Sequence, residues 1–386
     1  MYIEGLGGKA MKKRTKFLAV VVATVMAAST ILTGCGSKEN TGNEKHTIGV
    51  ILYGKDDAFG AAEYAYINSA AEALDVDIKW ALNDYTAEAQ LASAENLAAA
   101  GCEGLLFLPI SDNSVELISD YCESNKIWFQ MMNRDISDDT IKENTQANPY
   151  YVGTSFEANE DACDYMTQIL TEDGRTQVGL GKVAAGSSLS NRNDYFTEAA
   201  KKYGATILAD YTAPSDGSTQ AYVTYMQNFT TSYPEMNGLL MSSASGGGGE
   251  TVLNTLKSLV DPGTIKICSF DTFEGMQEGF NDGWLSCLAG GIEIQSLFDF
   301  VMLYNAVDGH PLADGYTVLY QNFIFITSSE DCENYSKYIS NPEYMIYDAE
   351  TIQSMTVRYN PDCTLKTLTD IMDAYTLESV VAAATE

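Results

Sequence analysis

The chain has 386 residues, and its 22 Lys and Arg residues against 53 Asp and Glu residues give a net charge of −31 at pH 7. So acidic a chain offers few clustered cations for phosphate contacts, which argues against direct binding to DNA or RNA. Hydrophobic residues make up 45% and aromatic residues 11%, which is enough for one or two packed cores and argues against a mainly disordered chain. The only histidines, His46 and His310, leave almost nothing for a histidine dyad or a multi-histidine metal centre.

The first 34 residues are basic, unlike the rest of the chain. Five Lys and Arg residues lie there against Glu4 alone, and an apolar run over residues 17–32 follows them. The run ends in Leu32-Thr33-Gly34-Cys35, which resembles a bacterial lipobox. We therefore expect a lipoprotein signal peptide over residues 1–34 and a lipid anchor with a flexible polar tether over residues 35–45. An ordinary signal peptide that ends in a chance cysteine is the alternative.

Next, apolar runs of strand length alternate with segments of helical spacing. This rhythm predicts a parallel, doubly wound α/β sheet. The expected strands are residues 46–53, 75–80, 104–109, 127–131 and 150–154, and the helices between them reach about residues 74, 100 and 125.

The rhythm then restarts, which predicts a second, similar lobe. Its expected helices are residues 157–170, 192–203, 221–231 and 250–259, and its strands are residues 181–185, 205–211, 238–242 and 265–271. Residues 284–288, helix 294–307 and residues 321–327 are typical of a chain that crosses back between lobes. We expect an N-terminal lobe of residues 46–154 plus about 291–325, a C-terminal lobe of residues 155–290, and a C-terminal extension from about residue 326 to 386. The extension has two helix-like stretches, residues 348–357 and 364–374, and no derived role.

Seven cysteines follow Cys35, and an odd number cannot pair completely. No CxxC motif or metal-ligand spacing is present. The spacing permits a bridge between Cys332 and Cys363 but does not require it. We expect most of these thiols to be free and structural.

Polar and aromatic residues follow the predicted strands, where ligands bind in open α/β sheets. Planar polar groups suit the hydroxyl pairs of a neutral polyhydroxylated ligand, and aromatic faces suit its C–H patches. The candidates are Tyr53, Asp57, Phe59, Asn133, Arg134, Arg192, Ser243 and Asp271. Plainer alternatives are core packing for Tyr53 and Phe59, helix capping for Asp57 and Asp271, and a local salt bridge between Arg134 and Asp135.

Residues 48–59, IGVILYGKDDAF, resemble the opening of periplasmic galactose/glucose-binding proteins. In that family the residues that match Tyr53, Asp57 and Phe59 line the sugar site, and those that match Asn133 and Asp271 bind sugar hydroxyls. Residues 226–241 are similar to ribose-binding proteins. The resemblance covers about residues 46–325 and implies the type I periplasmic-binding-protein fold, with two Rossmann-like lobes joined by a crossing-strand hinge.

Several family positions differ here, mostly in the second lobe. The family's second stacking aromatic falls near Ser215, a ligand-binding Asn falls at Ser243, and a hinge-side Asn or Gln falls at Gly290 or Gly291. Arg192 matches a ligand-binding Arg only after a shift of one residue. The first-lobe half of a hexose site is therefore kept, and the second-lobe half is rebuilt.

The family's calcium loop corresponds to residues 169–177. Its first ligand, normally a carboxylate, is Ile169, and its third position is Thr171. Calcium needs six or more oxygen ligands, so we expect no calcium and no other metal or cofactor.

The resemblance implies an extracytoplasmic, lipid-anchored solute-binding protein of an ABC importer. It would be a monomer with no catalytic residues and would deliver a hexose or pentose to the permease and ATPase subunits. Tyr53, Asp57, Phe59, Asn133 and Arg134 would hold the sugar from one side, and Arg192, Ser243 and Asp271 would engage it on closure. The alternatives are a non-sugar ligand (nucleoside, autoinducer or polyol), a sugar-sensing input to a membrane receptor, and an enzyme such as a glycosidase. Carboxylate pairs in so acidic a chain are only weak support for an enzyme.

Overall fold

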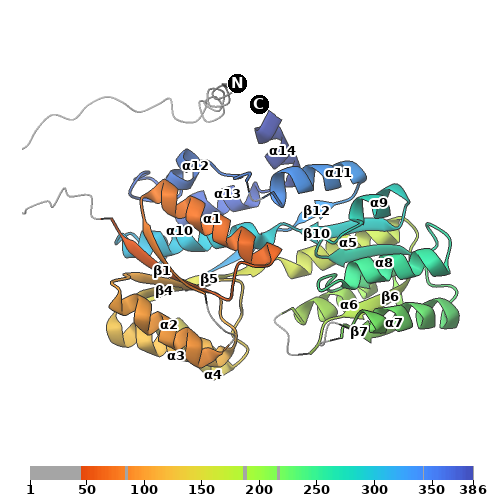
Figure 1. Cartoon of the computed structure of the whole chain (residues 1–386), viewed down its shortest axis with the longest axis horizontal. Helices are drawn as coiled ribbons and strands as arrows, with labels where there is room; N and C mark the ends of the chain where they lie inside the picture. The colour runs from red at the N-terminus through yellow and green to blue at the C-terminus, as the bar shows by residue number, and fades with distance from the viewer. Residues whose placement is uncertain (1–44, 83–85, 186–188, 215–217, 342, 386) are drawn as a thin grey trace, which may run out of the picture.

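The computed structural model describes residues 45–82, 86–185, 189–214, 218–341 and 343–385. Two α/β lobes lie side by side within these residues and meet at the middle of the molecule (Figure 1). The expected signal peptide, Cys35 and Ser215 lie outside the described residues. No helix in the described part of the chain is both long and apolar enough to cross a membrane.

The first lobe is built on a six-stranded parallel sheet in the order β11-β5-β4-β3-β1-β2. Central strands of such a sheet are covered on both faces, and β1 accordingly is a nearly continuous buried apolar run. The strands are β1 (Thr47–Leu52), β2 (Asp77–Leu82), β3 (Gly104–Phe107), β4 (Trp128–Met131), β5 (Tyr151–Glu157) and β11 (Thr317–Gln321). The helices are α1 (Ala58–Leu74), α2 (Ala87–Ala99), α3 (Asp112–Asn125), α4 (Asp139–Ala147) and α10 (Gln295–Val307), with a short 3-10 turn, η1 (Ile292–Ile294), before α10.

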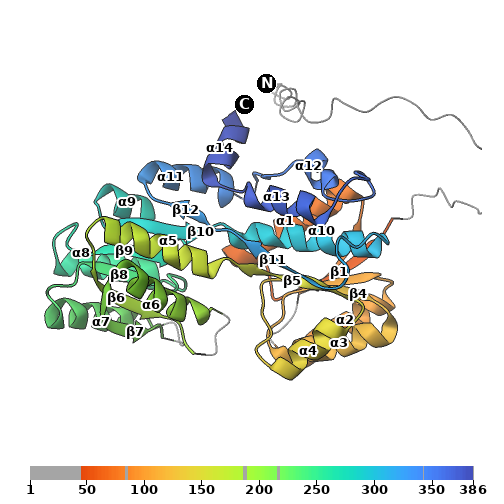
Figure 2. The same cartoon turned by 180° about the vertical axis from the view of Figure 1, so that it is seen from behind.

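The second lobe repeats this plan with the strand order β12-β10-β9-β8-β6-β7, in which only β12 runs antiparallel to its neighbour. Helices α5 and α6 pack on one face of the sheet, and α7 and α8 pack on the other (Figure 2). The strands are β6 (Gln177–Lys182), β7 (Thr206–Thr212), β8 (Gly238–Met241), β9 (Lys266–Phe270), β10 (Leu285–Gly290) and β12 (Ile324–Ile326). The helices are α5 (Asn159–Glu172), α6 (Asn191–Tyr203), α7 (Thr219–Ser232), α8 (Gly248–Leu259) and α9 (Met276–Asn281).

Three segments cross between the lobes. The first follows β5 at residues 157–159, the second follows β10 at residues 290–292, and the third joins β11 to β12 at residues 321–323. The third crossing corrects an expectation, because residues 324–325 belong to the second sheet and not to the first lobe. The apolar run over residues 321–327 hides this change of sheet, since a buried strand in either lobe has the same composition.

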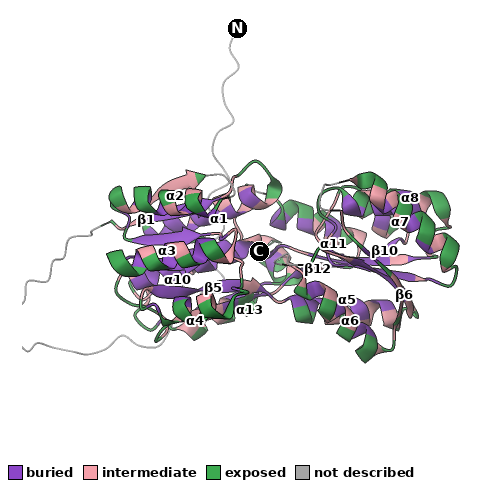
Figure 3. Ribbon diagram, turned by 90° about the horizontal axis from the view of Figure 1, so that it is seen from below, coloured by how far each residue is buried: buried purple, intermediate pink, exposed green. Residues whose placement is uncertain are grey.

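The C-terminal extension is folded and lies over both lobes (Figures 1 and 2). It contains α11 (Ser329–Asn334), a π-helical turn (Tyr335–Ile339), α12 (Ala349–Ser354), α13 (Leu365–Asp373) and α14 (Leu377–Thr385). Helix α12 packs on α1 of the first lobe, and α11 packs on α9 of the second lobe. Every residue of α10 from Gln295 to Ala306 is buried (Figure 3). A helix that is apolar on all sides needs such cover.

Strand β6 differs from its prediction, since it occupies residues 177–182 and not residues 181–185. Its sequence contains Gly179 and Gly181, which weaken a strand pattern. Both glycines make room for rings: a Cβ on Gly179 would lie 2.8 Å from the Phe229 ring, and one on Gly181 would lie 2.5 Å from the Tyr211 hydroxyl. Helices α4 and α9 were not predicted, because each buries a single residue and so shows no apolar stripe.

All seven cysteines in the described part of the chain are free and buried. No bridge joins Cys332 to Cys363, so the option left open by their spacing is not realised. Burial raises the pKa of each thiol, to about 12 at Cys122 and about 11 at Cys332.

We expect Gly153→Ala to weaken the contact between β5 and β11. Gly153 has φ +149, and a Cβ there would lie 1.9 Å from the Thr317 carbonyl oxygen on β11. Gly101→Ala is a matched control, because Gly101 also has positive φ (+89) but has open space around it. The control should lower the free energy of unfolding by about 1–2 kcal/mol through backbone strain alone. Urea denaturation should show a clearly larger loss for Gly153→Ala, and equal losses would mean that β11 moves aside at little cost.

Candidate functional site

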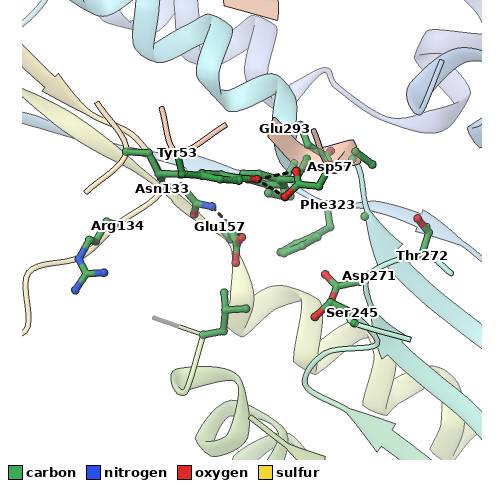
Figure 4. Close-up of a pocket in the computed structure, with 18 of the residues that line it drawn as sticks. Tyr53, Asp57, Asn133, Arg134, Glu157, Ser245, Asp271, Thr272, Glu293 and Phe323 are labelled. Atoms are coloured by element: carbon green, nitrogen blue, oxygen red, sulfur yellow. Dashed lines mark hydrogen bonds between the residues drawn. The ribbon is translucent and has the colours of Figure 1, made fainter. Parts of the chain in front are cut away.

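A cavity of about 750 Å³ lies between the lobes, at the carboxyl ends of strands from both sheets (Figure 4). In the first lobe its walls come from the segments after β1, β3 and β4 and from the end of β5. In the second lobe they come from the segments after β6, β8, β9 and β10, and the third crossing completes them. A second hollow of about 610 Å³ adjoins it and shares Asn133, Arg134, Glu157 and Leu189 with it. This is the place at which an open α/β sheet binds ligands.

The structure brings most of the predicted site residues together around this cavity. The predicted residues that line it are Tyr53, Asp57, Phe59, Asn133, Arg134, Arg192 and Asp271. Ser243 does not line it, and Ser245 takes that place. The Ser243 hydroxyl instead donates to Oδ2 of Asp271 at 2.6 Å, so its contact with the site is indirect.

Asp57 is held at the start of α1, where it is the N-cap residue. Its carboxylate accepts a bond from the Gly60 amide at 2.7 Å, and the Tyr53 hydroxyl donates to both of its oxygens at 2.8 and 3.0 Å. The capping alternative is therefore realised, and the same exposed carboxylate also faces the cavity. Phe59, two residues further along, packs against the apolar cluster of the second lobe.

Asn133 is the second residue after β4, and Asp271 directly follows β9. Both have a left-handed backbone, with φ of +45 at Asn133 and +67 at Asp271. The other two non-glycine residues of positive φ in the described chain, Asp75 and Lys126, are C-caps of helices. Strained positions that do not end a helix are typical of functional sites. Asp271 accepts from the Ala244 amide at 3.2 Å and does not cap α9, whose N-cap is Gly275.

Arg192 is buried, with 2% of its surface exposed, and its guanidinium is held by protein groups. It donates to Glu157 at 2.5 Å, to Asn159 at 2.8 Å and to the Ser242 carbonyl at 3.1 Å. Its guanidinium carbon lies 3.9 Å from the centre of the Phe270 ring. Arg192 therefore links the end of β5 and the first crossing to the second lobe at the floor of the cavity. The sequence did not predict this role.

Arg134 pairs with Asp112 at 3.3 Å, while Asp135 pairs with Lys142 at 2.8 Å. The alternative of a local salt bridge between Arg134 and Asp135 is therefore not realised, because Asp112 of α3 and Lys142 of α4 are their partners instead. The Arg134 Nε is buried and has no hydrogen-bond partner among the described residues.

Several residues that line the cavity are not among the predicted site residues. They are Glu157, Thr272, Glu293, Phe323 and Tyr335. Glu157 is the last residue of β5, and Glu293 and Phe323 lie at or beside the second and third crossings. These residues are near the cavity because of the path that the chain takes between the lobes, which local sequence does not specify. Tyr335 comes from the extension, for which the α/β rhythm has no place.

Carboxyl groups gather behind one wall of the cavity. Burial raises the pKa of Glu293 to about 7, helped by the charges of Asp271 and Glu157, and burial raises that of Asp299 to about 8 despite hydrogen bonds from Ser155 and Gln130. Glu63 on α1 is fully buried, and neither of its carboxyl oxygens has a partner among the described residues. Burial, followed by the charges of Glu293 and Asp299, holds the pKa of Glu63 well above its usual range. The proton of Glu63 is therefore held more tightly in the folded chain than in a free glutamate.

Within the described ranges, no group of three or more His, Cys, Asp or Glu side chains is placed to hold a metal ion. In the segment that corresponds to the calcium loop, Ile169 lies inside α5, and Asp173 pairs with Arg175 at 3.2 Å and Lys266 at 3.6 Å.

A sequence model of the periplasmic binding protein domain matches residues 48–293, well over half of the chain. No curated protein sequence matches the chain.

Solved structures share the fold at low identity. A solute-binding protein of an ABC transporter from Agrobacterium vitis, bound with α-D-tagatopyranose, is 17% identical with a TM-score of 0.59, and the match covers 74% of this chain and 96% of that one. A periplasmic ribose ABC transporter protein from Conexibacter woesei is 14% identical with a TM-score of 0.63, over 76% and 95% of the two chains. A periplasmic solute-binding protein from Actinobacillus succinogenes with bound D-allose is 14% identical with a TM-score of 0.60, over 75% and 100%. The two-lobed architecture is thus that of type I periplasmic binding proteins.

We expect Glu63→Gln to gain stability relative to the wild type as the pH rises from 4 to 8. The pKa of Glu63 is higher in the folded than in the unfolded chain, where it is about 4.3. The free energy of unfolding of the wild type therefore falls as pH rises above that value. Glutamine does not titrate, so the variant lacks this contribution to the pH dependence. Melting curves of both proteins at pH 4 and pH 8 measure this difference. Glu72→Gln, an exposed site on the same helix, should show no such divergence, and parallel behaviour of the two variants would contradict the expectation.

Proposed function

This chain belongs to the periplasmic binding protein domain family, and we propose that it is the solute-binding component of an ABC importer whose ligand is a monosaccharide, a hexose or a pentose. The observation that carries this proposal is the composition of the cavity. Acceptors from both lobes, Asp57 and Asn133 on one side and Asp271 on the other, face it together with the rings of Tyr53 and Phe59. Three solved neighbours carry sugars in their descriptions: tagatose, allose and ribose.

Closure of the lobes would trap the sugar. Tyr53, Asp57, Phe59, Asn133 and Arg134 hold it from the first lobe, and rotation about the three crossings brings Asp271 against it. Ser243 acts through Asp271, because its hydroxyl fixes one carboxylate oxygen and leaves the other for the ligand. The ligand favours the closed form only through contacts that exist in that form.

We further propose that the sugar leaves the protein unchanged. In this mechanism the chain is a monomeric carrier, and its closed form docks on a permease whose ATPase subunits drive release. Family membership places such a protein outside the cytoplasm. The lipobox-like segment Leu32-Thr33-Gly34-Cys35 supports attachment to the membrane through a lipid on Cys35.

A thermal-shift screen of the mature protein against monosaccharides and nucleosides tests the ligand class. At a ligand concentration of 100 times Kd, binding should add about 2.7 kcal/mol to the free energy of unfolding and raise the melting temperature. A shift with one or more monosaccharides is the expected result. A shift with nucleosides and with no sugar would refute the sugar assignment.

Asp271→Asn should weaken binding of the active sugar by about 10- to 100-fold, because a hydrogen bond to a charged acceptor contributes about 1.5–3 kcal/mol. Asparagine tolerates the left-handed backbone at this position, so the fold should survive. Asp282→Asn, at the far end of α9 beside Lys257, is the matched control and should bind normally in isothermal titration calorimetry. Unchanged affinity in Asp271→Asn would remove Asp271 from the site.

Cys35→Ala should release the protein from the membrane fraction of expressing bacteria and abolish incorporation of labelled fatty acid, since lipidation requires the thiol. Cys332→Ala is the control, because this thiol is buried in the folded body. Labelling that persists in Cys35→Ala would mean that the anchor lies elsewhere.

A further inference from the structure

The C-terminal extension reaches into the interlobe cavity through one side chain. Tyr335, the first residue of the π-helical turn, lines the cavity and is only 3% exposed. Its hydroxyl lies against the second crossing: a Cβ built on Gly290 would be 2.7 Å from it. Thr272 and the backbone of Gly291 are hydrogen-bonding neighbours of the same hydroxyl.

A second tyrosine of the extension hydrogen-bonds to Gly291, the next residue of this crossing. Tyr375, between α13 and α14, is 2% exposed and donates from its hydroxyl to the Gly291 carbonyl at 2.8 Å. A Cβ on Gly291 would lie 2.9 Å from the Tyr375 hydroxyl, and the φ of Gly291 is +77. Two hydroxyls from the extension therefore occupy the space that side chains on residues 290 and 291 would fill.

The polar group at this part of the cavity wall therefore comes from the extension and not from a side chain of the crossing. Glycines at both positions give the crossing no side chain of its own, and the Tyr335 hydroxyl stands in the same place. Burial, with the nearby charge of Glu293, raises the pKa of Tyr335 well above its ordinary value. The hydroxyl therefore stays protonated and is a hydrogen-bond donor at any physiological pH.

The extension is fixed to both lobes around this contact. In the first lobe the Gln353 side chain donates to the Ala73 carbonyl at 2.8 Å, and the Asn305 side chain donates to the Met355 carbonyl at 3.1 Å. In the second lobe the Gln277 side chain donates to Glu333 at 2.7 Å. Tyr335 is thus placed by a folded segment and not by a free tail.

The solved neighbours point to the extension as an addition to the fold. Their matches cover 95–100% of their own chains but only 74–76% of this chain. The family match ends at residue 293, before the extension begins.

We propose that the C-terminal extension is part of the ligand site, with Tyr335 as a specificity-determining residue that donates a hydrogen bond to one hydroxyl of the bound monosaccharide. This inference rests on the proposed function, because it names a further contact to the same sugar. Tyr375 is a positioning residue, since it holds the crossing against which Tyr335 lies.

Tyr335→Phe tests the contact, with Tyr347→Phe as the matched control. Tyr347 is also in the extension, its hydroxyl donates to the Ile371 carbonyl at 3.2 Å, and it does not line the cavity. Isothermal titration calorimetry with the sugar found in the screen should show about tenfold weaker binding for Tyr335→Phe and wild-type binding for the control. The melting temperatures of the two ligand-free variants should be similar.

Deoxy analogues of the same sugar separate direct contact from a structural effect. One analogue, which lacks the hydroxyl bound by Tyr335, should bind equally to wild type and Tyr335→Phe, whereas the others should keep the tenfold difference. An equal loss for every analogue, or no loss for the parent sugar, would overturn the inference while the proposed function stands. Failure of the wild type to bind any monosaccharide would instead refute the proposed function and this inference with it.

Discussion

The arrangement of the two lobes depends on one buried ion pair, between Arg192 at the start of α6 and Glu157 at the end of β5. A buried guanidinium destabilises a fold unless its charge and its N–H groups are satisfied. Here Glu157 supplies the charge, Asn159 and the Ser242 carbonyl accept further bonds, and the Phe270 ring covers one face. Because Glu157 belongs to the first sheet and Arg192 to the second lobe, the pair fixes the floor of the cavity.

The sequence was sufficient for much of the fold and for half of the site. Tyr53 and Asp271 directly follow strands, and Asn133 and Asp57 lie two and five residues beyond strand ends. A strand end in a parallel sheet has a fixed place, so local pattern alone brings these residues together. The role of Arg192 could not be found in this way, because its partners lie 33 to 50 residues away along the chain. The choice of Ser245 over Ser243 as a lining residue likewise depends on how the loop after β8 turns.

The packing of the C-terminal extension was the part of the fold that the sequence predicted least, although one feature indicated that the first lobe needs additional cover. Helix α10 carries apolar residues on all sides, as in its segment Leu297-Phe-Asp-Phe-Val-Met-Leu303, so a two-layer lobe would leave one face of it in water. The residues that cover this face could have been sought in the unassigned C-terminal segment. That Tyr335 reaches the cavity follows only from three-dimensional packing, because nothing local distinguishes it from the other 23 of the 24 tyrosines.

The burial of every described cysteine has a practical consequence. The thiols of the folded body are covered and have raised pKa values, so we expect them to react slowly with maleimides. A single cysteine introduced on the outer surface of each lobe would then be the preferred point of attachment for a fluorophore. With donor and acceptor dyes at two such points, energy transfer would follow the opening and closing of the lobes in solution, without removal of any native residue from the folded body.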